Sequence, residues 1–166
     1  MTKCKISLLS LALLMLLCGV AQAQTTCFGA QGGTVVPGLL TYYSSTTANA
    51  ASHLYVSNVS GSNVTCKVTV FDKDGNDVTA SYSQVFSGGT NVSTGTGTFD
   101  LPAGSTRMYR FKTSQGGGSI YAYALIEWKS DDPRLRKALV AMHYRQQAIG
   151  SSYQMSDTSV NGGMPF

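Results

Sequence analysis

Few residues in this 166-residue chain have the types and spacing that catalysis requires. The two histidines, His53 and His143, lie far apart, and neither belongs to a nucleophile–base motif. Glu127 is the single glutamate and most aspartates occupy turn-like segments, so no pair of carboxylates for glycoside cleavage is evident. We therefore expect a non-enzymatic protein that needs no cofactor and no metal, with a hydrolase whose site the sequence does not reveal as the alternative.

An acidic segment resembles a calcium-binding loop in composition, through Asp72, Asp74, Asn76 and Asp77. The EF-hand order places its glycine after a third ligand and adds a distal glutamate, and both features are missing. Side chains of these types also bond their own backbone in turns. We interpret the segment as a hairpin turn, with calcium binding as the alternative.

Tyr121 and Tyr123 form the most suggestive binding surface in the sequence. They alternate with Ile120 and Ala122, so both rings are expected on the exposed face of a strand. Neighbouring aromatic rings on a sheet can bind sugar rings or a strand of another protein. If the next segment returns as a hairpin, His143 lies beside them. The alternative is that a neighbouring sheet or the C-terminal tail covers the rings.

Residues 1–23 have the three parts of a secretory signal peptide. Lys3 and Lys5 precede an apolar run over 6–20, and a small-x-small cleavage site occupies 21–23. The run is shorter than the roughly 20 residues of a membrane-spanning helix. A lipoprotein anchor on a cysteine of this segment would need a small residue before it, where leucine stands.

Cleavage would leave a mature chain beginning at Gln24, without membrane insertion. It would be secreted to the cell surface or beyond, with the periplasm as the alternative. Without Lys3 and Lys5, the twelve lysines and arginines fall to ten against eight acidic residues, a net charge of +2. This charge and the lack of a basic run argue against nucleic acid. The expected partner is another protein or a second copy of the chain, possible polysaccharide binding being the alternative.

Two cysteines remain after cleavage, Cys27 and Cys66. In an oxidising compartment they are expected to form one disulfide. Its loop of roughly 40 residues would stabilise the fold by about 3–4 kcal/mol in the chain-entropy model. Neither CxxC spacing nor clustered histidines suggest a redox or metal role.

Apolar and polar residues alternate with a period of two through most of the mature chain, and this pattern predicts strands. We expect an N-terminal arm with a first strand over 24–52, a β-sheet core over 53–147, and a C-terminal tail or edge strand over 148–166. Within these parts, strands are expected near residues 39–43, 54–57, 64–70, 81–87, 98–101, 105–112 and 119–129.

Residues 133–149 fit two structures. A helix with a proline in its first turn would carry an apolar stripe. A strand that returns after a short loop would pair Lys129 with Leu135 and set Glu127 opposite Lys137. We favour this hairpin because the opposed side chains match in charge and polarity.

Two stretches of the sequence resemble those of a known class of domains. They are LYVSNVSGSNVTCKVTVFDKDG at 54–75, and LPAGST at 101–106 followed by YALIEW at 123–128. These two stretches resemble the sequences of small exported bacterial immunoglobulin-like domains. The resemblance implies a single antiparallel β-sandwich of about seven to eight strands, and it brings no catalytic residue.

Sandwiches of this class often serve as surface, adhesive or matrix components, so the resemblance also implies a function. We expect a structural or binding module that acts through sheet edges or its tail. The alternative is a carbohydrate-binding or sensory accessory module.

Overall fold

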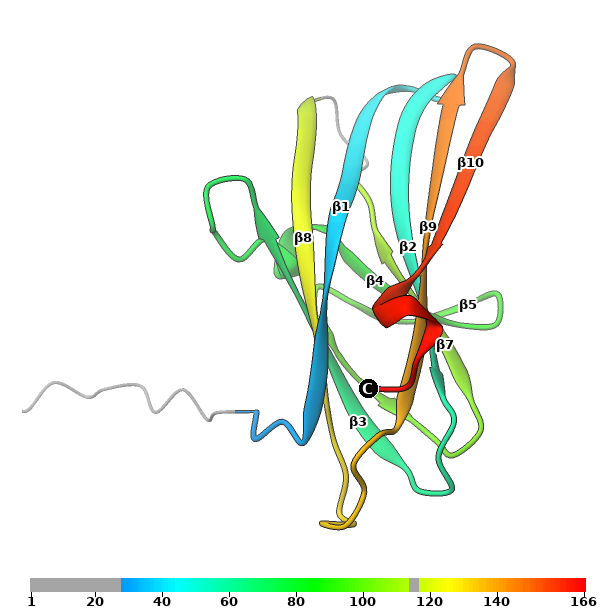
Figure 1. The fold of residues 1–166 in the computed structure, drawn as a ribbon. Coiled ribbons are helices and arrows are strands. Elements are labelled where there is room, and N and C mark those ends of the chain that lie inside the picture. Colours follow the sequence, from blue (N-terminus) through cyan, green and yellow to red (C-terminus); the bar gives the residue numbers. More distant parts are fainter. Residues whose placement is uncertain (1–27, 114–116) are drawn as a thin grey trace, which may run out of the picture.

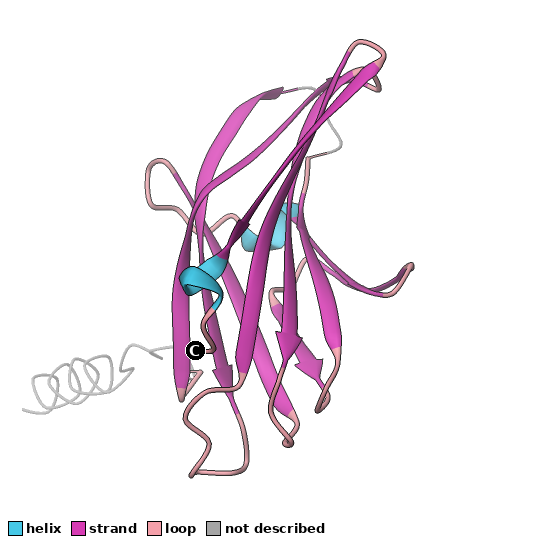
Figure 2. Ribbon diagram, turned by 45° about the vertical axis from the view of Figure 1, so that its right-hand side comes forward, coloured by secondary structure: helices cyan, strands magenta, loops and turns pink. Residues whose placement is uncertain are grey.

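The computed structural model describes residues 28–113 and 117–166. The predicted signal peptide and Cys27 lie outside these residues. The described part consists almost entirely of antiparallel strands (Figures 1 and 2). Its elements are β1 (Gly32–Ser45), β2 (Ala48–Asn58), β3 (Val64–Asp72), α2 (Thr79–Tyr82), β4 (Ser83–Ser87), β5 (Thr90–Thr94), β6 (Thr98–Leu101), β7 (Thr106–Phe111), β8 (Gly117–Lys129), β9 (Leu139–Ile149), β10 (Ser152–Ser159) and η1 (Val160–Gly163).

The predicted immunoglobulin-like sandwich is wrong, because the strands form one continuous sheet that curls into a nearly closed barrel (Figure 1). The strand order is β5-β4-β7-β2-β1-β8-β3-β6, and β9 and β10 extend the sheet from the other edge of β2. A sandwich has two sheets that are not hydrogen-bonded to each other. Here β1 and β2 join what would be the two layers. Alternation along a strand is the same in both architectures, so it could not distinguish them.

Strand β2 makes this continuity possible by changing its partner along one edge. It pairs with β1 at Ala50, and from Ser52 onward it pairs with β7. The fully buried Ser52 hydroxyl accepts a hydrogen bond from Leu40 N (2.9 Å) and donates one to Leu40 O (3.1 Å). The side chain therefore satisfies backbone groups of β1 at the point where the two strands separate.

Strand β1 is longer than the predicted 39–43 and contains Pro37, which cannot donate to a ladder. Its pairing with β8 shifts register between Val36 and Leu39, around Pro37 and Gly38. Gly38 has a φ of 76°, which glycine adopts without strain. A bulge thus accommodates the residue that cannot donate to the ladder.

The strand prediction for the segment after Pro133 is confirmed over β9, but its predicted hairpin partner is wrong. β8 lies between β1 and β3, whereas β9 pairs with β2 and β10. The charged partner of Glu127 is Lys67 on β3 rather than Lys137. A matched pair of charges supported the hairpin, but the same match exists with a strand much earlier in the chain.

The barrel encloses one apolar core around Trp128, which is fully buried. Gly32 lies opposite it on β1, and a Cβ on this glycine would stand 2.6 Å from the indole nitrogen. The indole N–H donates to the main-chain oxygen of Phe166 at 2.8 Å. The core comprises Val36, Leu39, Leu54, Val56, Val64, Cys66, Val68, Val70, Val85, Phe99, Leu101, Tyr109, Phe111, Ala124, Ile126, Trp128, Ala138, Leu139, Ala141, Val160 and Phe166.

The predicted C-terminal edge strand is present as β10, and the residues after it fold back onto the barrel. Phe166 N donates to Leu139 O at 2.9 Å, and Phe166 O accepts from the amides of Ala138 and Leu139. The Phe166 side chain is buried in the core. The segment after η1 therefore adds main-chain bonds to the start of β9 and covers Trp128.

We expect Ser52→Ala to lower the free energy of unfolding by about 1–3 kcal/mol, because it leaves buried backbone groups of Leu40 without a partner. Urea unfolding measures this effect. Ser57→Ala is the control on the same strand, since the Ser57 hydroxyl bonds Thr106 at an exposed position. It should change stability by less than about 0.5 kcal/mol. Equal losses in both variants would contradict the role of Ser52.

We expect Phe166→Ala to cost roughly 3 kcal/mol of unfolding free energy, because it empties a buried site in the core. Met164, two residues earlier, is 60% exposed. Met164→Ala should therefore leave the urea midpoint almost unchanged. A Phe166→Ala midpoint equal to that of the wild type would show that the last residues do not contribute to the core.

Candidate functional site

Tyr121 and Tyr123 lie on the outer face of β8, as predicted, with 60% and 41% of their surface exposed. Phe71, the direct neighbour of Tyr123 on β3, stacks on its ring at a centroid distance of 5.2 Å. Sequence reasoning missed Phe71, because its partner on β8 depends on a long-range register. We refer to Phe71, Tyr121 and Tyr123 as the aromatic row.

His143 does not lie beside the aromatic row, since β9 does not pair with β8. It stands directly opposite Leu54 of β2, and directly paired residues share a face, so it points to the inner side of the barrel. There it lines a groove with Arg145. Burial, with the neighbouring Arg145 charge, lowers the pKa of His143.

This groove marks where the barrel stays open. β1 leaves β2 after the Ser52 position, and its free edge faces β9 and β10 across a cavity of about 470 Å³. Its walls are apolar on β1 and polar on β10. They include Val35, Pro37, Gly38, Ser156, Thr158 and Asn161.

Cys66 lies on the inner face of β3, completely buried, and forms no disulfide with any residue in 28–113 or 117–166. Burial raises the pKa of this thiol strongly. Its predicted disulfide partner, Cys27, lies outside the described residues. The disulfide between them therefore stays a prediction.

The acidic segment after β3 is built as a turn. The Asp72 carboxylate accepts hydrogen bonds from the amides of Asp74 and Asn76, each at 2.9 Å, and these bonds together with the Asn76 side chain lower its pKa. Gly75 has a φ of 83°. Both carboxylate oxygens of Asp72 thus accept hydrogen bonds from within the turn. Across residues 28–113 and 117–166, no group of three or more His, Cys, Asp or Glu side chains could hold a metal ion.

Strand β10 presents an open edge. All eight of its residues are exposed, and within the described part of the chain it pairs only with β9. Tyr153 and Met155 are 62% and 63% exposed, and Asp157 is the only charged residue of the strand. The β9–β10 hairpin extends beyond the neighbouring strands (Figure 2). Only the glycine turn at Gly150 and the spacing of Tyr153 and Met155 signalled this strand in the sequence.

His53 lies on the outer face of β2, where its 5% exposure makes it a buried polar residue. Arg110 of β7 and Tyr144 of β9 are its direct neighbours across the sheet. Burial, reinforced by the Arg110 and Lys112 charges, lowers the pKa of His53 to about 4. The imidazole is therefore neutral at physiological pH.

The comparisons with known proteins support the fold only. No protein-family model matches the chain, and no curated protein matches it. Among solved structures, it is similar to one described as "Crystal Structure of Thermotoga maritima 1070", with a TM-score of 0.50 and 11% identity over 80% of this chain and 96% of that chain. Of the earlier resemblance, the all-β antiparallel character is thus supported, and an immunoglobulin-like family is not.

Within residues 28–113 and 117–166, no helix is long and apolar enough to cross a membrane.

We expect the protein to lose stability as the pH falls from about 6.5 to about 4. In this interval the unfolded chain protonates His53, whose ordinary pKa is 6.5, whereas the folded chain keeps it neutral. The unfolded state then binds more protons, so acid favours unfolding, by up to about 3 kcal/mol for this residue. Urea unfolding at a series of pH values measures the slope. His53→Gln should flatten it, leaving the smaller slope due to His143, and an unchanged slope in this variant would contradict the assignment.

Proposed function

We propose that the chain is an exported, non-enzymatic binding module of the bacterial cell surface or extracellular matrix. It binds another protein chain, a second copy of itself in the first instance, through the outer edge of β10. The observation that carries this proposal is the fully exposed edge strand, with two large apolar side chains on it.

Edge strands carry unpaired backbone donors and acceptors, and most proteins protect them with charge, proline, bulges or a cover. β10 has eight residues, no proline and one charge, and its pairing with β9 runs without a register shift from Ser152 to Ser159. Another strand can therefore add to it, with main-chain hydrogen bonds supplying affinity and alternate side chains supplying specificity. Tyr153 and Met155 are the side chains placed for that role.

A second copy of the chain suits this edge because two identical strands can pair antiparallel about a twofold axis. Each residue then meets its counterpart in the same way on both sides. The edge is the same on both partners, so no further complementary surface is required. The predicted signal peptide over residues 1–23 supports export, where such an assembly would form outside the cytoplasm.

The placement of the titratable groups supports a non-enzymatic role. His53 lies on the outer face of the sheet and His143 on the inner face, so the two cannot act on one substrate. Glu127 stands opposite Lys67 on the outer face of β8, with no second carboxylate paired across the strand. No acid–base pair is thus formed by these three residues.

The aromatic row favours a second candidate function, binding of a neutral polysaccharide. Phe71 stacks on Tyr123, and the exposed rings of Tyr123 and Tyr121 follow each other on the outer face of β8. Rings of this kind pack against the apolar faces of sugars. This row lies on β3 and β8, away from β10, so the two functions can be separated by mutation.

We expect Met155→Lys to weaken self-association at least roughly tenfold, because a lysine on an edge strand opposes pairing with a second strand. Multi-angle light scattering of the exported protein over a concentration series measures the assembly state. Tyr121→Lys is the matched control, since it replaces an equally exposed apolar side chain on β8 by the same charge.

Tyr121→Lys should leave assembly unchanged. Loss of assembly in this variant, with assembly retained in Met155→Lys, would move the contact surface to the aromatic row. A wild-type protein that stays monomeric at high concentration would exclude the second copy as the partner.

A further inference from the structure

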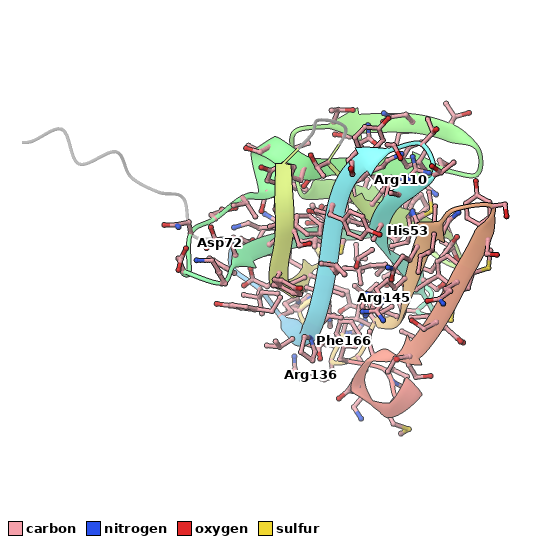
Figure 3. All side chains as sticks on the ribbon, turned by 90° about the horizontal axis from the view of Figure 1, so that it is seen from above. His53, Asp72, Arg110, Arg136, Arg145 and Phe166 are labelled. Atoms are coloured by element: carbon pink, nitrogen blue, oxygen red, sulfur yellow. The ribbon has the colours of Figure 1, made fainter. Side chains whose placement is uncertain are left out.

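A basic pocket lies on the outer face of β2, between β7 on one side and the β9–β10 hairpin on the other. Its volume is about 470 Å³. His53 forms part of its floor, and Figure 3 shows His53 and Arg110 beside each other at the same side of the molecule. We refer to this cavity as the basic pocket.

The charges in the basic pocket all have one sign. Arg110 and Lys112 line it, and no aspartate or glutamate does. Asp157 of β10 shares this outer face, but it stands opposite Tyr144 and does not line the cavity. Among the described residues, the two ion pairs lie elsewhere, in turns. The positive charge of the pocket is therefore not neutralised by the protein itself.

Two polar atoms at the basic pocket are buried without a hydrogen-bond partner, Nδ1 of His53 and Nε of Arg110. A buried polar group left unpaired costs free energy that a partner would recover. The Arg110 guanidinium is also held in place, with the Phe86 ring 4.5 Å from it. A fixed guanidinium next to unpaired nitrogens is an arrangement suited to receive an anion.

The rim of the basic pocket suits a polar ring rather than a bare ion. Tyr43 and Tyr153 line it from β1 and β10, and the side chains of Asn49, Gln146 and Thr46 add amide and hydroxyl groups. Aromatic faces and uncharged donors of this kind complement the apolar faces and hydroxyls of a sugar. The cavity volume falls within the range of pockets that hold small organic ligands.

We propose that the basic pocket binds an acidic saccharide, with the carboxylate of a uronic acid unit on Arg110 and Lys112. The two cations fix the carboxylate, and the tyrosines and amides contact the sugar ring. This site lies on the outer face and shares Tyr153 with the proposed assembly surface, but its two cations, Arg110 and Lys112, lie outside β10, so the two proposals can be tested separately.

Binding of a carboxylate here also affects His53. The groups that face this histidine are Arg110 on β7, Lys112 just after β7 and Tyr144 on β9, and the charge of His143 acts on it through the sheet. A bound anion offsets the repulsion from the two cations. Saccharide binding should therefore raise the pKa of His53 and strengthen as the pH falls towards about 4, the pKa of this histidine in the free protein.

The test is calorimetry of the exported protein with oligogalacturonate, compared with a neutral galactose oligomer of the same length. We expect binding of the acidic oligomer only. Arg110→Gln and Lys112→Gln should each weaken it by roughly tenfold to a hundredfold, the range for a lost charged hydrogen bond. Arg134→Gln is the control, since this side chain is 90% exposed and lies in a distant loop.

Several outcomes would overturn the proposal. These are no binding of the acidic oligomer, equal binding of the neutral oligomer, or unchanged binding of the acidic oligomer in Lys112→Gln. Lys112→Gln replaces an outward-facing side chain, so this variant should fold even if Arg110→Gln does not. Binding of inorganic sulfate alone, with the same dependence on Lys112, would show a site for a free anion instead. Met155→Lys should not weaken saccharide binding, because Met155 does not line the pocket, and this separates the result from the assembly.

A second readout comes from the His53 imidazole in an NMR pH titration. Its pKa should rise when the acidic oligomer is added and stay unchanged with the neutral oligomer. An unchanged His53 pKa with bound oligogalacturonate would place the saccharide elsewhere, the aromatic row being the next surface to test.

Discussion

The barrel depends on the buried hydroxyl of Ser52, which lies at the point where β1 separates from β2. A sheet strand has two edges, and β2 shares one of them between β1 and β7. Where β1 leaves, the N–H and C=O of Leu40 would face the interior without partners, a cost that folded proteins avoid. Ser52 supplies both an acceptor and a donor there. An apolar residue at this position could fill the space but could not complete the backbone hydrogen bonding, so the branch requires a small polar side chain.

The same separation determines which parts of the sheet stay open. Once β1 has left β2, its edge faces β9 and β10 across a groove, and the chain must cover the core beneath it by other means. The last residues do so, with Phe166 bonded to Leu139 and to the Trp128 indole. Gly32 permits this arrangement, since a larger residue would displace the indole. β10 is the last strand on this side of the sheet and pairs only with β9 among the described residues, so its other edge is free.

The sequence predicted local structure well and long-range pairing poorly, for a physical reason. Alternation along β2, β3 and β8 reflects one buried face and one exposed face, and it persists whatever the partner strand is. Partner choice depends on complementarity between distant segments, so Glu127 could be matched equally to Lys137 and to Lys67. The exposure of Tyr121 and Tyr123 followed from alternation, whereas their neighbour Phe71 did not. β10 gave little signal because both of its faces are exposed, and the basic pocket gave none because it combines side chains from five strands.

One register connects the core with the outer surface. On β2, Leu54 and Val56 face inward while His53 and Tyr55 face outward, so a slip of one residue would exchange a buried leucine for a histidine. The apolar core therefore fixes the position of His53 next to Arg110, because moving His53 would require the core residues of β2 to leave the core. The neighbours of His53 come from β7 and β9, which pair with opposite edges of β2. Because their registers on β2 are set by the same core residues, a surface site formed across three strands can be rigid without any bond between its own side chains.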